Sequence, residues 1–406
     1  MKLLILLKKH FSLLLIIVGA GAVFFSNIIL KGILTEFEYG EYSIFITFLQ
    51  LCISFGLLGL EQVFMRVAEV SKNATIHIDK KLIIGTLVVG ILASALLSFF
   101  FVTYFFTLEI NYWLLFLLTF ASAMTMFYYN VLRIRKDFSV SQLVNNSWKF
   151  LLFIIAIFLF FQQEKGATYF ITLFSYIFIA IWIIFSVYII KNIVFDYRIH
   201  LKMKTILSYS FHFTLSMITL TFIAFSDRFF IKGAFGSEVF GNYFYLSTIF
   251  YFPFSLIQGY IGFKELVYFK THASTAIVKK KLVSVNVFSV LLAVGIVLVS
   301  WLLNYYNIIP AISFESDWVL ILFLLLLGIT RINYSLLSSV MGAIGSVKLI
   351  RNANFQSLFF ILLILLVGYR YIISIEIVAF SILLIWMSRI IIWYYNSLKQ
   401  LKLKNA

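Results

Sequence analysis

The feature that most constrains this chain is a series of apolar runs, each long enough to cross a lipid bilayer, separated by short polar connections. Inside a bilayer every backbone N–H and C=O group needs a partner within the protein, so such runs fold as helices. Proline occurs only twice, and 63% of the 406 residues are hydrophobic. We therefore predict an all-α integral membrane protein with twelve transmembrane helices. They are expected at 11–33, 42–60, 82–106, 111–132, 143–161, 168–190, 206–226, 243–263, 282–304, 317–341, 354–371 and 373–395.

Positive charge is distributed unevenly among the predicted connections. The chain carries 32 Lys and Arg residues against 16 Asp and Glu residues, a net charge of +16. Such an excess also suits a nucleic-acid-binding protein, but most of these cations fall in connections that the twelve-helix arrangement places on one side of the membrane. The positive-inside rule explains this pattern without a nucleic-acid partner. It predicts that both termini are cytoplasmic.

Several kinds of chemistry are disfavoured by what the sequence lacks. Cys52 is the only cysteine, so neither an intrachain disulfide nor a cysteine-based metal site can form. No Walker-type phosphate-binding sequence with its lysine is present, so we expect no ATP binding. The chain is expected to work without a cofactor or a metal.

Two stretches of the chain share one sequence frame, in which Lys-Gly is followed by seven residues, Gly, one residue and Tyr. The frame occurs as Lys31-Gly32, Gly40 and Tyr42, and again as Lys232-Gly233, Gly241 and Tyr243. Each position of the second copy lies 201 residues after its partner in the first. Since each half then holds six helices, both copies enter the membrane from the same side. This predicts two parallel six-helix repeats, residues 1–197 and 198–406, around a central cavity.

Three further motifs lie in order along this frame. They are Glu38-Tyr39-Gly40-Glu41-Tyr42, the run from Gly56 to Gln62 that leads to Arg66, and Asp227-Arg228-Phe229-Phe230. Together with the six-plus-six frame, they resemble the polysaccharide-exporter branch of the multidrug/oligosaccharidyl-lipid/polysaccharide exporter superfamily, which includes O-antigen and capsule-unit flippases. The chain departs from that family at Ser26-Asn27, where relatives often carry a charged residue.

The resemblance implies a transporter rather than an enzyme. Its activity would be the transfer of an undecaprenyl-pyrophosphate-linked oligosaccharide from the cytoplasmic to the outer face of a bacterial cytoplasmic membrane, by alternating access. The partners it implies are this lipid-linked oligosaccharide, membrane lipid, a proton or sodium gradient, and a polysaccharide polymerase.

Charged residues inside the predicted spans or at their ends are candidates for the substrate site. Arg331 lies near the middle of the tenth span, where an arginine is costly unless it is hydrated or paired, and its guanidinium suits a pyrophosphate. Arg66 and Arg228 could also bind the pyrophosphate, but each is equally explained as an interfacial charge or a local ion pair. Asp227 could bind a coupling proton or cation, or could instead fix Arg228 structurally.

Other charged residues within or beside the spans are expected to be structural. Lys149 and Arg389 lie nearer to the cytoplasmic ends of their spans, so their side chains should extend to the headgroups. Lys31 and Lys232 occupy equivalent positions at helix ends and are expected to anchor there as well.

Two other functions compete with the flippase. An ion-coupled drug or cation antiporter of the same fold should carry interior carboxylates, whereas the clearest mid-span charge here is Arg331. A membrane glycosyltransferase or polysaccharide polymerase could use Glu36-x-Glu38 as an acidic site. However, the connection that holds this pair is only about ten residues long, which is short for holding a sugar.

Overall fold

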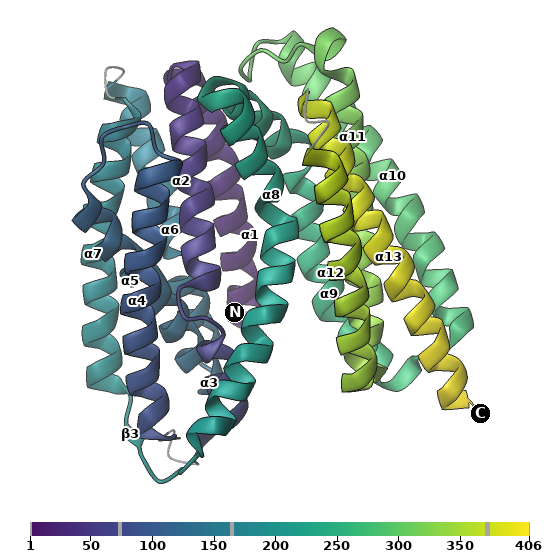
Figure 1. Cartoon of the computed structure of the whole chain (residues 1–406). Coiled ribbons are helices and arrows are strands. Elements are labelled where there is room, and N and C mark those ends of the chain that lie inside the picture. The colour runs from purple at the N-terminus through teal and green to yellow at the C-terminus, as the bar shows by residue number, and fades with distance from the viewer. Residues whose placement is uncertain (1, 72–74, 163–165, 370–373, 406) are drawn as a thin grey trace. The chain divides into compact units, whose positions relative to one another are not determined.

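A computed structural model describes residues 2–71, 75–162, 166–369 and 374–405, most of which lie in helices (Figure 1). Among these residues, ten helices are long and apolar enough to cross a membrane. The chain is therefore a multi-pass, all-α membrane protein. It forms two compact units, Met1–Phe222 and Ile223–Ala406.

The N-terminal unit is arranged around one central helix, α5 (Tyr112–Ile134), which packs against α2, α4, α6 and α7, while α1 packs against α6. Small hydroxyl residues on the buried face of α5 allow close packing. For example, Ser122 and Thr125 each donate a hydrogen bond of 2.7 Å to a carbonyl one turn earlier. The other helices of this unit are α1 (Lys2–Ile33), α2 (Glu36–Phe55), α3 (Leu60–Val67), α4 (Lys80–Tyr104), α6 (Phe138–Gln162) and α7 (Ala167–Asn192). The unit also includes α8 (Met203–Phe250) as far as Phe222.

Side-chain caps determine where several of these helices begin. Thr35 and Glu38 form a capping box at the start of α2, in which each side chain accepts the other residue's backbone N–H. Asp79 accepts the N–H of Lys81 at 2.8 Å before α4, and Asn111 caps α5 in the same way. These bonds satisfy N–H groups that have no partner within their own helix.

A small sheet joins two connections of the N-terminal unit. β1 (Glu69–Val70) pairs antiparallel with β2 (Ile76–His77), and β2 pairs in parallel with β3 (Phe195–Asp196). In addition, Asp79 accepts the N–H of Leu201 at 2.6 Å. The sequence predicts both connections on the cytoplasmic side, and the structure brings them together at one end of the unit, the lower end in Figure 1.

The C-terminal unit is also arranged around one helix, α11 (Phe314–Ile344), which packs against α9, α10 and α13, while α12 packs against α13. If the helices are counted in order along each half of the chain, the α9–α11 and α10–α11 pairs correspond to α2–α5 and α4–α5. The α11–α13 and α12–α13 pairs correspond to α5–α7 and α6–α7. The remaining helices of this unit are α8 from Ile223 onward, α9 (Phe252–His272), α10 (Thr275–Tyr305), α12 (Val347–Tyr369) and α13 (Ile375–Asn405).

Helix α8 contains one break. Gly236 has φ 82° and ψ −175°, a conformation that strains any residue with a Cβ atom, and it separates residues 203–235 from 237–250. The residue 201 positions earlier is Thr35, which lies in extended conformation between α1 and α2. The helix is therefore interrupted at the same position in both copies of the sequence frame.

The span count differs from the predicted twelve in the C-terminal half. The six spans predicted before residue 193 all coincide with long apolar helices. In the second half, α8 runs from the seventh predicted span into the eighth, α9 carries Lys264 and Glu265, and the described part of α12 offers only the short apolar stretch Leu349–Ile364. The boundary expected between residues 371 and 373 lies outside the described residues. The lobe boundary predicted after residue 197 lies before α8. The N-terminal unit instead extends into α8 as far as Phe222.

Candidate functional site

Asp227 is buried on α8 in the C-terminal unit, nine residues before the break at Gly236, with 8% of its surface exposed. The hydroxyl of Tyr243 donates a hydrogen bond to Asp227 Oδ2, while Oδ1 has no hydrogen-bond partner in the described residues. In the first copy of the frame the hydroxyl of Tyr42 donates to Asn27 Oδ1 at 2.6 Å; Asn27 lies one position after Ser26, the residue 201 positions before Asp227. The tyrosine of the frame thus binds back to the preceding helix segment in both copies. Only the second copy uses a carboxylate for this purpose.

Arg331 lies on α11 in the interior of the same unit and interacts electrostatically with Asp227. The centre of its guanidinium is 5.2 Å from the ring centroid of Tyr251 and 5.1 Å from that of Trp386. Its Nε atom is buried and has no hydrogen-bond partner in the described residues. The side chain is therefore held among aromatic rings, as a cation–π contact requires, with part of its donor capacity unused.

Arg228 also interacts electrostatically with Asp227 and lies near the Phe225 and Phe244 rings, at 5.0 and 5.1 Å. Beside it is a small cavity whose polar and aromatic lining consists of Asp227, Arg228, Ser247, Tyr251 and Trp386. The free volume of this cavity is about 10 Å³, room for roughly one water molecule. The cavity is thus partly polar, with one carboxylate and one guanidinium in its lining, but too small for a sugar.

Arg389 is a further interior arginine, and its position differs from the one predicted. It was expected to extend to the headgroups, but only 1% of its surface is exposed. Its Nη2 donates to the Tyr334 hydroxyl at 2.9 Å and to Asn354 Oδ1 at 3.2 Å. Its Nε and Nη1 are buried with no hydrogen-bond partner in the described residues. A sequence signal for this site was the spacing Trp386, Arg389, Trp393, which puts three large side chains on one face of a helix.

Aromatic rings connect Arg389 with Arg331. The ring of Tyr334 lies 5.2 Å from that of Trp386 and 5.5 Å from that of Trp393. Trp386 in turn packs against Arg331, and Tyr334 accepts the hydrogen bond from Arg389. The interior of the C-terminal unit therefore holds a continuous series of cation–π and aromatic contacts between α11 and α13.

Arg66 belongs to the N-terminal unit and is not part of this arrangement. It is exposed near the end of α3, and its guanidinium lies 4.8 Å from the Tyr209 ring of α8. The structure thus brings Arg228, Asp227 and Arg331 together, whereas Arg66 lies in a separate surface environment.

The remaining charged residues singled out in the sequence are engaged in local contacts. Lys31 pairs with Glu36 at 2.5 Å, and Glu38 is part of the capping box of α2. Lys232 is buried and donates to the Ser237 hydroxyl, and Lys149 donates to Asn146 Oδ1 at 2.8 Å. Neighbouring side chains therefore contact each of these three lysines.

Comparison with known proteins gives no further assignment. No protein-family model, curated protein or solved structure matches this chain. Within the described residues, no group of three or more His, Cys, Asp and Glu side chains could hold a metal ion. The functional argument therefore rests on the geometry of the C-terminal unit and on the sequence frame.

Proposed function

We propose that this protein is a flippase that moves an undecaprenyl-pyrophosphate-linked oligosaccharide, of the O-antigen or capsule type, across a bacterial cytoplasmic membrane. The observation that carries this proposal is the group of buried and half-buried arginines in the C-terminal unit. Arg228 and Arg331 lie near a single carboxylate, and Arg331 retains a buried N–H donor without a partner in the described residues. Such an excess of guanidinium groups inside a membrane protein suits an anionic substrate.

The proposal includes twelve spans in two parallel six-helix repeats around a central cavity. Three observations support it: the interruption at Thr35 and Gly236, the hydrogen bonds of Tyr42 and Tyr243, and the recurring helix pairings around α5 and α11. In this arrangement α8 contributes two spans separated by Gly236. The pairing of β2 with β3 supports placing their two connections on the same, cytoplasmic, side.

The chemistry of the arginines favours a pyrophosphate over a neutral sugar. A guanidinium forms paired hydrogen bonds with phosphate oxygens, and its charge attracts them in a site with little water. The aromatic rings around Arg331 would orient the guanidinium and leave its positive charge available to the substrate. A carboxylate in direct contact would neutralise that charge. The site would therefore distinguish less strictly between different glycans than between anionic and neutral substrates. This suits a protein that moves a whole repeat unit.

One observation favours a second candidate, an ion-coupled drug or cation antiporter. Asp227 is buried, and its Oδ1 has no hydrogen-bond partner in the described residues, so it could accept a proton or bind a cation during transport. The two neighbouring arginines weaken this candidate because they repel a cationic substrate. The same carboxylate fits the flippase as a coupling site.

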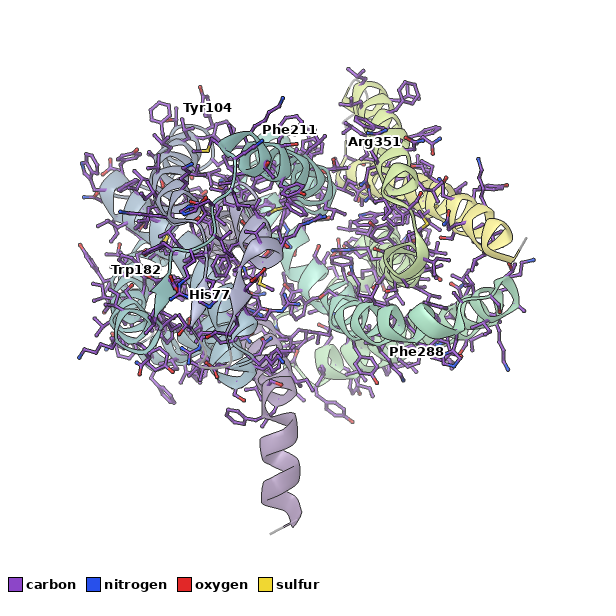
Figure 2. The ribbon with its side chains drawn as sticks, turned by 90° about the horizontal axis from the view of Figure 1, so that it is seen from below. His77, Tyr104, Trp182, Phe211, Phe288 and Arg351 are labelled. Atoms are coloured by element: carbon purple, nitrogen blue, oxygen red, sulfur yellow. The ribbon has the colours of Figure 1, made fainter. Side chains whose placement is uncertain are left out.

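The role of Arg331 can be tested by surface display of the glycan in cells that depend on this protein. Arg331→Ala should reduce display at least tenfold, because the phosphate-binding guanidinium is lost, while the amount of protein in the membrane stays unchanged. Arg331→Lys should restore display only in part, since an ammonium cannot make the paired bonds. Arg351→Ala is the matched control, because Arg351 is an exposed arginine on α12 (Figure 2). Normal display by Arg331→Ala would refute this assignment.

The role of Asp227 can be tested by the dependence of transport on ion gradients. Asp227→Asn keeps the shape of the side chain and a hydrogen-bond acceptor for Tyr243 but cannot exchange a proton. If Asp227 couples transport, the variant should lose the response of the transport rate to an imposed proton or sodium gradient. A variant that responds to the gradient as the unmodified protein does would leave Asp227 a structural role only.

A further inference from the structure

The C-terminal unit has a lateral groove between α10, α11 and α13. It encloses about 570 Å³, and its walls are mostly Leu, Ile, Val and Met side chains. Each helix contributes one stripe at helical spacing; on α10 the stripe runs from Lys279 through Leu282 and Val283 to Asn286. Three neighbouring helices therefore form a continuous channel along the surface of the unit.

The groove has a definite direction. Lys279 and Tyr394 lie at one end of it, near the start of α10 and toward the end of α13, which is the lower end of the unit in Figure 1. Thr330 and Met387 line the other end. The seven residue-to-residue steps from Lys279 to Asn286 correspond to about 10 Å along a helix, roughly a third of the hydrocarbon thickness of a bilayer. The groove thus fits within one leaflet.

The floor of the groove is fixed by a hydrogen bond between two helices. Nδ2 of Asn333 on α11 donates to Oδ1 of Asn286 on α10 at 2.7 Å. This bond holds α10 against α11 although the rest of α10 is largely exposed; Phe288, for example, is 48% exposed and lies at the outside of the unit (Figure 2). The width of the groove is therefore set by the protein, and does not depend on an occupant.

The charge at one end indicates what the groove binds. Lys279 is the one charged residue that lines it in the part of the chain the structure describes, and no carboxylate faces it there. Lys281, by contrast, pairs with Glu265 and lies 3.8 Å from the Tyr268 ring, away from the groove. A lysine and a tyrosine at one end of an apolar channel match a lipid headgroup above a hydrocarbon chain.

We infer that this groove is a binding site for an anionic phospholipid, whose phosphate is bound by Lys279 and one of whose acyl chains lies along α10, α11 and α13. A second copy of the chain or a helix of another protein would bury the apolar walls equally well. Neither would explain why the charged residue that lines the groove, among the described residues, is a lysine at the headgroup end. The inference does not depend on what the protein transports.

The test is native mass spectrometry of the whole protein, released from detergent after mixing with phosphatidylglycerol or phosphatidylcholine. The unmodified protein should retain one phosphatidylglycerol in preference to phosphatidylcholine. Lys279→Ala should reduce that preference about fivefold, the contribution of one lysine near an anionic headgroup. Lys280→Ala is the matched control, because Lys280 is an exposed neighbour that does not line the groove, and it should leave the preference unchanged.

A groove-filling variant separates the site from the general lipid layer. Val283 is 65% exposed, so Val283→Phe can be accommodated by the fold while it obstructs the channel, and retention of both lipids should fall. Equal retention by Lys279→Ala and by the unmodified protein would overturn the inference. So would a dimer of the unmodified protein that Val283→Phe dissociates, because the groove would then be an interface between two copies.

Discussion

At the scale of single residues, the interior of the C-terminal unit is organised by arginines that are held mainly by aromatic rings. Arg389 is fully enclosed, and within the described residues its guanidinium donates to two acceptors, the Tyr334 hydroxyl and Asn354 Oδ1. A buried cation with so few acceptors costs free energy, which a protein retains where the charge serves a function. The same consideration applies to Arg331, whose guanidinium also lies beside two aromatic rings.

Tyr334→Phe isolates the hydrogen bond to Arg389, because it removes the hydroxyl and keeps the ring. A hydrogen bond to a charged group contributes about 1.5–3 kcal/mol, so the variant should unfold several degrees earlier in a thermal scan in detergent. Tyr395→Phe on α13 is the control, since Tyr395 is 69% exposed, and its unfolding temperature should not change. Equal unfolding temperatures for Tyr334→Phe and the unmodified protein would show that Arg389 is stabilised by something other than this bond.

At the scale of structural elements, the break in α8 and the small sheet are the two features that no apolar run reveals. The break depends on a single backbone conformation at Gly236, and the sheet depends on strands of two residues each. Both can be tested without disturbing the packed core.

Gly236→Ala tests whether the break is a required backbone conformation. An added Cβ would meet open space at both Gly236 and Gly233, so steric clash cannot separate the two positions. Only Gly236 has a positive φ, so Gly236→Ala should destabilise the protein by about 1–2 kcal/mol, or straighten the helix. Gly233→Ala, within regular helix, should be neutral or stabilising by about 0.5–1 kcal/mol. Identical unfolding curves for the two variants would contradict the role of Gly236.

Asp79 predicts how the sheet region responds to pH. Burial raises the pKa of Asp79, but the N–H groups of Leu201 and Lys81 and the nearby charges of Lys81 and His200 outweigh it, so the pKa lies below its ordinary value. A lowered pKa in the folded state adds stability above the unfolded pKa of about 3.9 and loses it as the pH falls through the folded value. The difference in unfolding temperature between the unmodified protein and Asp79→Asn should therefore be constant from pH 7 to 5 and shrink below about pH 4. A difference that grows toward low pH would contradict this account.

At the scale of the whole molecule, the lengths of the apolar runs predict most of the long helices. The first six spans coincide with helices because their apolar runs are long and bounded by caps such as Thr35 and Asn111. The later spans are less regular, since α9 carries charges and α8 continues as a helix through the polar stretch between the seventh and eighth predicted spans as far as Gly236. These are features of backbone conformation and helix contact, which hydropathy does not encode.

The candidate site was predictable only in part. Placing an arginine in the middle of a span costs free energy, so Arg331 was identified from the sequence as a functional candidate. In the fold, Arg331 and the Asp227-Arg228 pair interact electrostatically. Arg389 was assigned to the interface because its distance from the end of the span permits extension. Its burial depends on Tyr334, Asn354 and Trp393, which come from three different helices and are brought together only by folding.

The most direct test of the central claim is the sidedness of the lipid-linked oligosaccharide in inverted membrane vesicles, with and without this protein, read with a probe that cannot cross the bilayer. We predict that intact oligosaccharide moves to the lumen only when the protein is present, and that Arg331→Ala abolishes this movement while Arg351→Ala does not. Absence of movement with the natural lipid-linked glycan and an imposed ion gradient would contradict the flippase and favour the antiporter. A lengthened glycan would instead indicate a polymerising enzyme.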